Sequence, residues 1–212
     1  MPILEITGLR KTYTTRLGGN RVEALKNVSF TAEPGEYIAI MGESGSGKTT
    51  LLNILAALDK PTGGSVILDG MDLAKIKESK LADFRRDNLG FVFQEFNLLD
   101  TFTVRDNILL PLVLRGEKYP AMQPKLNSTA ELLALFAEIN RRGQTILMVT
   151  HSAKAASRAK RVLFIKDGAV FHQLYRGNCS DDEFYRRITD ALTLLSSSEE
   201  PQSLRIKREG AE

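Results

Sequence analysis

Eight consecutive residues in the first quarter of the chain have the composition of a phosphate-binding loop. They read Gly42-Glu43-Ser44-Gly45-Ser46-Gly47-Lys48-Thr49 and fit the pattern G-x-x-x-x-G-K-[ST]. Glycines let such a loop curl so that successive backbone N–H groups point inward at phosphate oxygens, and the helix that follows adds its positive N-terminal end. Lys48 is expected to reach the β- and γ-phosphates, and the Thr49 hydroxyl to ligate Mg²⁺. The pattern therefore predicts binding of a nucleoside triphosphate.

The residues on either side of this loop agree with that prediction. Tyr37 to Met41 is a short apolar run typical of a buried strand, and Lys48 to Leu58 places its apolar residues on one face of a helix. A strand, a glycine-rich turn and a helix in this order are the context that a phosphate-binding loop needs. A chance glycine-rich turn would lack that context.

Short apolar runs alternate with helical patterns along the rest of the chain. This alternation predicts an α/β fold: a P-loop NTPase with a mostly parallel core sheet flanked by helices, plus an antiparallel β subdomain. Residues 3–32 and a hairpin over 162–174 are the parts expected to be antiparallel. Asp69-Gly70 and Asp167-Gly168 are two-residue turn signals. The expected strands are 3–9, 28–32, 37–41, 65–68, 89–93, 145–150, 162–165 and 170–174. The expected helices are 48–58, 81–86, 104–114, 128–142 and one that follows Ser180.

Composition excludes several classes of protein. The chain has 212 residues, 42% of them hydrophobic, which is enough for a core. A net charge of +3 does not indicate a nucleic-acid partner. No window approaches the roughly 18 apolar residues of a membrane span, and residues 1–5 do not resemble a signal peptide. Cys179 is the only cysteine, so no intrachain disulfide can form. We expect a soluble, cytosolic protein.

From Ile3 through Leu114 the sequence resembles the ATP-binding subunits of ABC transporters. Ile6 to Tyr13 resembles the family's opening strand, which ends in an aromatic residue, and Val22 to Phe30 resembles the next strand pair. Gly90-Phe91-Val92-Phe93-Gln94 resembles the Q-loop strand with its glutamine. Further along, Thr145 to His151 resembles the strand that leads to the switch histidine.

This resemblance implies roles for individual residues. Tyr13 would stack on the adenine of ATP, with Val22 packing nearby. Gln94 would coordinate Mg²⁺ or position the attacking water, and His151 would hydrogen-bond the γ-phosphate. The resemblance therefore implies that Lys48, Gln94 and His151 are the catalytic residues. The stretch that binds nucleotide would continue through Thr50.

Two stretches narrow the resemblance further. Gln94 to Val104 and Thr150 to Ser157 resemble the ATPases of bacitracin-type antimicrobial-peptide resistance transporters, with lipoprotein-release and macrolide-export ATPases as near relatives. The resemblance implies a subunit that couples ATP binding and hydrolysis to a membrane permease. Such subunits form a homodimer on ATP binding and lie at the inner face of the cell membrane.

Two segments of the family pattern are absent from this sequence. It contains no Leu-Ser-Gly-Gly-Gln signature and no Walker B strand ending in Asp-Glu, because Val66-Ile67-Leu68-Asp69 is followed by Gly70. We therefore expect an ATP-binding domain over 1–195 with an internal deletion near 125–127 and a truncated helical subdomain, then a flexible tail over 196–212. Loss of the Walker B glutamate would remove the general base for water, which contributes roughly 10²–10⁴ in rate. Loss of the strand would leave its neighbours in the sheet unpaired.

These observations leave three hypotheses about the protein. The first is an ABC transporter ATPase subunit from whose sequence an internal segment has been omitted. The second is a true internal deletion, which would give a nucleotide-binding module deficient in hydrolysis. The third is an unrelated P-loop enzyme, such as a kinase or a GTPase. It leaves the order of Tyr13, Gln94 and His151 around the phosphate loop unexplained, and the sequence has no Asn-Lys-x-Asp guanine motif.

Overall fold

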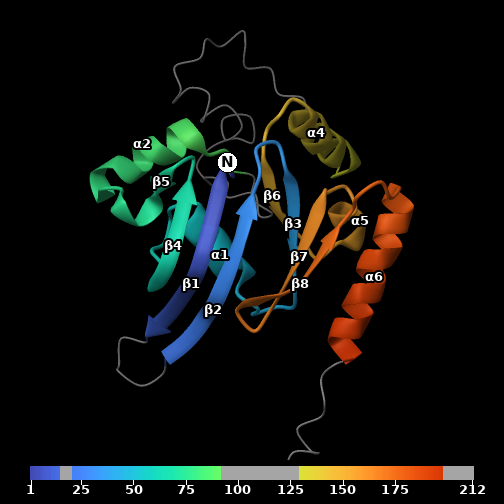
Figure 1. Ribbon diagram of the computed structural model, residues 1–212, viewed down its shortest axis with the longest axis horizontal. Coiled ribbons are helices and arrows are strands. Elements are labelled where there is room, and N and C mark those ends of the chain that lie inside the picture. Colours follow the sequence, from blue (N-terminus) through green and yellow to red (C-terminus); the bar gives the residue numbers. More distant parts are fainter. Residues whose placement is uncertain (15–20, 92–128, 198–212) are drawn as a thin grey trace, which may run out of the picture.

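One mixed sheet of eight strands organises the protein. The computed structural model describes residues 1–14, 21–91 and 129–197, with side chains placed except at 129–134 and 195–197. The strand order is β5-β4-β1-β2-β8-β7-β3-β6 (Figure 1). The strands are β1 (Leu4–Thr14), β2 (Arg21–Ala32), β3 (Tyr37–Met41), β4 (Gly63–Leu68), β5 (Met71–Asp72), β6 (Ile146–Val149), β7 (Arg161–Lys166) and β8 (Ala169–Tyr175).

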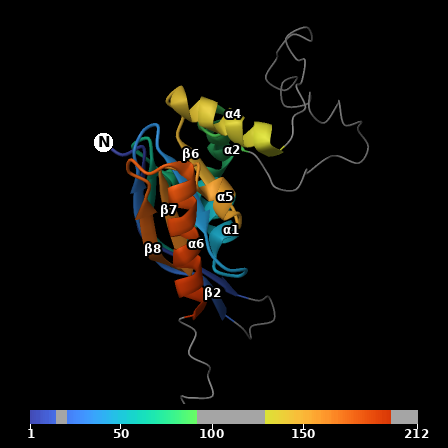
Figure 2. The same cartoon turned by 90° about the vertical axis from the view of Figure 1, so that its right-hand side faces the viewer.

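Strand β3, which leads to the phosphate loop, lies in the interior. All five of its residues are buried, and it runs parallel to both β6 and β7. Ile38 and Ile40 belong to a core shared with α1 (Lys48–Leu55) on one face of the sheet. Tyr37 and Met41 belong to a second core, shared with α6 (Asp181–Ser197) on the other face. In Figure 2, α6 runs in front of the strands and α1 is seen to its right. Burial on both faces explains why this strand is apolar throughout.

The antiparallel part of the sheet was predicted correctly. β1 pairs antiparallel with both β2 and β4, and β7 and β8 form an antiparallel hairpin. Both predicted turns are confirmed: Asp69 and Gly70 have φ of 48° and 75°, and Asp167 and Gly168 have φ of 50° and 76°. Two successive left-handed residues match the right-handed twist of the strands they join.

Helix boundaries differ in places from the sequence prediction. Helix α1 ends at Leu55 rather than at 58, because Ala57 adopts a left-handed conformation with φ 52° that closes the helix. Helix α2 (Glu78–Asn88) is longer than predicted, and α4 (Thr129–Arg141) stops before Gly143 as expected. The helix expected after Ser180 is confirmed as α6, and the Glu183 N–H donates to the Ser180 hydroxyl at 3.2 Å. The short elements η1 (Leu73–Lys75) and α5 (Ala153–Ala156) were not predicted.

Some predictions were wrong or lie outside the described residues. The strand expected over 89–93 is absent from its first three residues, because Leu89 instead closes α2 by donating its N–H to Arg85. Helix α6 continues through Ser197, two residues into the expected tail. Residues 92 and 93, the helix expected over 104–114, the proposed seam at 125–127 and the tail from 198 onward are not described.

Strand β6 stands at one end of the strand order. Within the described part of the chain it pairs only with β3, and all four of its residues are half-buried rather than buried. The described residues also contain no helix with the length and apolarity needed to cross a membrane.

Candidate functional site

The phosphate loop needs glycine at two positions for steric reasons. A Cβ on Gly42 would lie 2.2 Å from the Ile165 carbonyl oxygen of β7. A Cβ on Gly47, whose φ is 101°, would lie 2.4 Å from the Ala24 carbonyl oxygen of β2. Both distances are far below van der Waals contact, so no side chain fits without moving the backbone. The loop is therefore held against two strands, and its glycines make that close approach possible.

The turn between β7 and β8 is hydrogen-bonded to the phosphate loop. The Gly168 N–H donates to the Ser46 carbonyl at 3.1 Å, and the Gly168 carbonyl accepts from the Lys26 N–H at 2.8 Å. One turn residue thus joins β2 to the phosphate loop. This contact fixes the loop between elements that are more than 100 residues apart in the sequence.

The Lys48 side chain is buried and lies inside the loop. Its ammonium donates to the carbonyl oxygens of Gly42 at 2.9 Å and Glu43 at 2.5 Å, and to the Ser46 hydroxyl at 3.2 Å. Burial lowers the pKa of Lys48, and the charge of the Glu43 carboxylate opposes that shift. The ammonium is therefore held at the centre of the curled backbone, where its charge can meet phosphate oxygens.

The N-terminus of α1 offers backbone donors at the same place. Gly47 is the N-cap and supplies no side-chain cap, and the first helical bond runs from the Leu51 N–H to the Gly47 carbonyl at 2.9 Å. The N–H groups of the first turn then point along the positive end of the helix, which favours an anion. The Thr49 side chain is exposed at this end.

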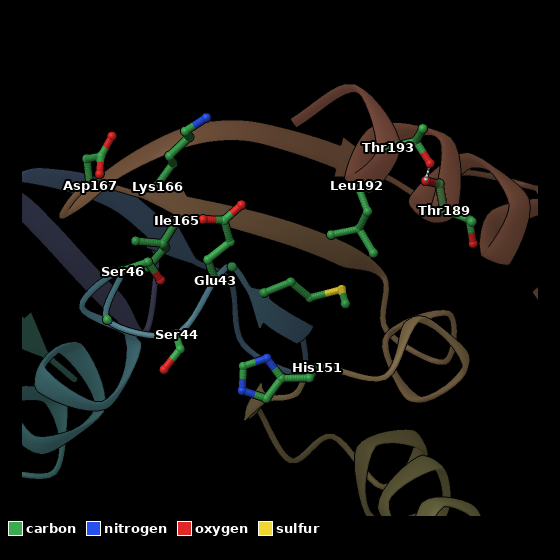
Figure 3. Close-up of a pocket in the computed structure, with 13 residues that line it drawn as sticks. Glu43, Ser44, Ser46, His151, Ile165, Lys166, Asp167, Thr189, Leu192 and Thr193 are labelled. Carbon is green, nitrogen blue, oxygen red and sulfur yellow. Dashed lines mark hydrogen bonds between the residues drawn. The ribbon is translucent and has the colours of Figure 1, made fainter. Parts of the chain in front are cut away.

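A cavity of about 560 Å³ adjoins the loop. His151 follows β6 and lines it together with Ser44, and Figure 3 shows both side chains. Helix α6 also lines the cavity, through Leu192 and Thr189. Figure 3 shows Leu192 pointing into the cavity. The structure therefore brings the predicted histidine and phosphate loop to one cavity. The contribution of α6 was not predicted, because nothing local in its sequence indicates that it reaches the loop.

Tyr13 and Val22 are direct cross-strand partners near the end of the β1–β2 hairpin. Such partners project from the same face of a sheet. Both are exposed for large apolar residues, at 41% and 57%. Burial and the Asp59 carboxylate raise the pKa of the Tyr13 phenol, whereas the nearby Thr50 side chain in the first turn of α1 acts in the opposite direction. The predicted base-stacking pair thus lies beside the helix that follows the phosphate loop.

Two side chains next to Tyr13 were missed by sequence reasoning. The Tyr13 hydroxyl donates to the Asp59 carboxylate at 2.7 Å, and the same carboxylate forms an ion pair with Lys11. The alternation Lys11-Thr12-Tyr13 places lysine and tyrosine on one strand face and could have indicated that Lys11 lies next to Tyr13. No local signal indicates Asp59. Gln94 is outside the described residues, so its place at the site stays a prediction.

The residues present suit a magnesium ion held jointly with phosphate. No group of three or more His, Cys, Asp and Glu side chains in the described ranges could hold a metal by itself. Magnesium commonly takes one or two protein oxygens together with phosphate oxygens and water. The exposed Thr49 hydroxyl beside the α1 N-terminus is an oxygen of that kind.

Comparison with known proteins identifies the family to which this chain belongs. The profile of the family described as "ABC transporter" matches residues 25–163, well over half of the chain. The chain therefore belongs to the ABC transporter family, among its ATP-binding subunits. It is 37% identical to the ABC transporter ATP-binding protein YxdL of Bacillus subtilis, over 92% of this chain and 95% of that protein.

Other relatives carry more specific names. The bacitracin export ATP-binding protein BceA of Halalkalibacterium halodurans is 37% identical over 89% of this chain and 94% of its own length. The macrolide export ATP-binding/permease protein MacB of Hyphomonas neptunium is 32% identical over 80% of this chain and 34% of its own. Among solved structures, a dimer of the ATP-binding cassette MJ0796 bound to ADP and phosphate matches with a TM-score of 0.71 and 29% identity, over 81% of this chain and 98% of that one.

These alignments are longer than the part of this chain that they use. The alignment with YxdL runs over 249 positions, whereas 92% of 212 residues is about 195, so about 54 positions have no residue from this chain. The alignment with MacB runs over 221 positions against about 170 residues, which is 80% of the chain. The relatives therefore contain about 50 residues within the aligned region that this chain does not have.

Proposed function

We propose that this chain binds ATP with Mg²⁺ and, as a homodimer, transmits the binding event to a membrane permease. The observation that supports this best is the phosphate loop, with its buried Lys48 ammonium and the uncapped N-terminus of α1. Phosphates would lie on the loop from Gly42 to Thr50, Thr49 would hold Mg²⁺, and the base would stack on Tyr13 beside Val22. His151 would contact the γ-phosphate, and Gln94 would act at the same metal.

The transported material in this proposal is an antimicrobial peptide or a related export substrate. BceA is named for bacitracin export and MacB for macrolide export, and this chain resembles both. The permease would hold the chain at the inner face of the cell membrane. MJ0796 has been solved as a dimer, which supports the same assembly here.

Calorimetric titration with ATP tests the binding step. The full chain should bind ATP in the presence of Mg²⁺, and chelation of Mg²⁺ should weaken that binding. Lys48→Ala should weaken ATP binding at least tenfold, because it removes a charge-assisted donor to phosphate. Lys75→Ala is the matched control, since that lysine is 84% exposed and belongs to η1, which follows β5 at the end of the strand order far from β3. Equal affinities for Lys48→Ala and the unchanged chain would contradict the proposal.

A second candidate is a module that binds nucleotide without hydrolysing it. It is favoured by the roughly 50 aligned positions that this chain lacks and by the end position of the half-buried strand β6. It predicts ATP binding with negligible release of phosphate. Mg²⁺-dependent hydrolysis that is abolished by Lys48→Ala would rule it out. Intact-mass measurement of the native chain distinguishes a true deletion, at 23.5 kDa, from a longer protein.

A further inference from the structure

A single carboxylate connects the proposed base-stacking residue to its surroundings. Asp59 accepts a 2.7 Å hydrogen bond from the Tyr13 hydroxyl and forms an ion pair with the Lys11 ammonium. The same ammonium donates to the Lys60 carbonyl at 2.7 Å and lies 4.8 Å from the centre of the Tyr13 ring. Lys11 is buried, with 10% of its side chain exposed. These contacts restrain both the hydroxyl and one face of the ring.

The backbone around Asp59 is itself fixed. After the left-handed Ala57 closes α1, the Asp59 N–H donates to the Asn53 carbonyl at 3.1 Å, so the chain folds back along the helix. Thr62 then donates its N–H to the Arg10 carbonyl of β1 at 2.9 Å. Asp59 is thus held between the phosphate-loop helix and the strand that carries Tyr13.

The charge state of Asp59 favours lasting contacts with Lys11 and Tyr13. Burial would raise the pKa of the Asp59 carboxyl, but hydrogen bonds from Lys11, Tyr13 and the Lys60 backbone outweigh burial and hold the pKa below its ordinary value. Asp59 is therefore a carboxylate near neutral pH and can keep both partners. An aromatic ring with a cation on one face leaves the opposite face for a planar base.

The geometry points to Asp59 as a positioning residue for the nucleotide base: together with Lys11 it fixes the Tyr13 ring beside α1, so that the base meets a pre-oriented surface. This inference rests on the proposed binding of ATP with its base on Tyr13. A side chain that is already ordered costs less entropy when a ligand binds to it. Loss of Asp59 should therefore weaken recognition of the base and leave recognition of the phosphates unchanged.

Calorimetric titration of the full chain with two ligands separates these effects. ATP reports base and phosphate recognition together, and inorganic tripolyphosphate reports the phosphate part alone. We expect Asp59→Asn to weaken ATP binding about three- to tenfold with no change for tripolyphosphate. Tyr13→Phe, which keeps the ring and removes the donor to Asp59, should act in the same direction. In a Tyr13→Ala background, Asp59→Asn should have no additional effect.

Glu78→Gln is the matched control, because it removes an exposed carboxylate that pairs with Lys60 at 2.5 Å and does not touch Tyr13. It should bind ATP like the unchanged chain. The inference is overturned if Asp59→Asn binds ATP with unchanged affinity, if both ligands weaken equally, or if the loss persists in the Tyr13→Ala background. If the unchanged chain binds tripolyphosphate and Lys48→Ala does not, the proposed phosphate site stands whatever the Asp59 result. If the unchanged chain binds neither ligand, the proposed function fails and the inference fails with it.

Discussion

The Arg161 guanidinium lies 2.8 Å from the Glu36 carboxylate, and 7% and 14% of the two side chains are exposed. The Nε atom in this contact is not aligned for a hydrogen bond. The Nη2 atom is aligned: it donates to Glu36 at 3.0 Å and to the Thr31 carbonyl at 2.5 Å. One arginine of β7 therefore joins the end of β2 to the residue that precedes β3, the strand that leads into the phosphate loop.

Replacing this arginine should destabilise the fold strongly. Arg161→Met should lower the free energy of unfolding by about 3–5 kcal/mol, because it leaves the Glu36 carboxylate largely buried without its partner. Urea unfolding followed by circular dichroism measures the change. Lys60→Met, which breaks the exposed pair with Glu78, should cost no more than about 1 kcal/mol. Similar losses for the two variants would show that the buried pair has no special importance.

Gly47→Ala should damage the phosphate loop more than Gly45→Ala. Both residues have positive φ, which costs an alanine about 1–2 kcal/mol. A Cβ at Gly45 meets nothing within 4 Å, whereas at Gly47 it meets the Ala24 carbonyl oxygen at 2.4 Å. We expect Gly47→Ala to lose about 2–4 kcal/mol of unfolding free energy, and ATP binding with it. Equal stability of the two variants in urea would refute this steric account.

Tyr13→Trp would provide a direct optical test of base stacking. The chain contains no tryptophan, so the new indole would be the only one. Stacking of a purine on the indole should quench its emission, because the two π systems come into contact. ATP should therefore quench the fluorescence in a saturable manner, and inorganic tripolyphosphate should not. Quenching by both ligands to the same extent would indicate a change at the phosphate loop instead of stacking.

The contribution of Asp59 to stability should depend on pH in one direction. Its pKa in the folded chain is lowered below the ordinary value of 3.8, so its stabilising contribution is complete above that pH. The contribution should disappear as the pH falls through the lowered pKa, where the folded chain must also take up the proton. The difference in melting temperature between the unchanged chain and Asp59→Asn should accordingly be constant above 3.8 and shrink below it. A difference that grows on acidification would contradict the assigned ion pair.

The features that the sequence predicted correctly are those whose conformation depends on neighbouring residues. The strand over 37–41, the glycine-rich loop and the start of α1 follow from apolar run, glycine spacing and helical periodicity. The turns at Asp69-Gly70 and Asp167-Gly168 and the start of α6 after Ser180 are local for the same reason. The strand expected to begin at Leu89 was wrong because a short apolar run does not distinguish a strand from the end of a helix.

By itself, then, the sequence determined that a phosphate loop exists, where it lies and which family pattern it follows, because a few adjacent residues specify that backbone. Only the tertiary structure decided what surrounds the loop. The contact between Tyr13 and Asp59, 46 residues apart, and the approach of α6 to the cavity depend on how two cores pack on opposite faces of β3. Such contacts arise from the packing of whole elements, so no stretch of neighbouring residues encodes them.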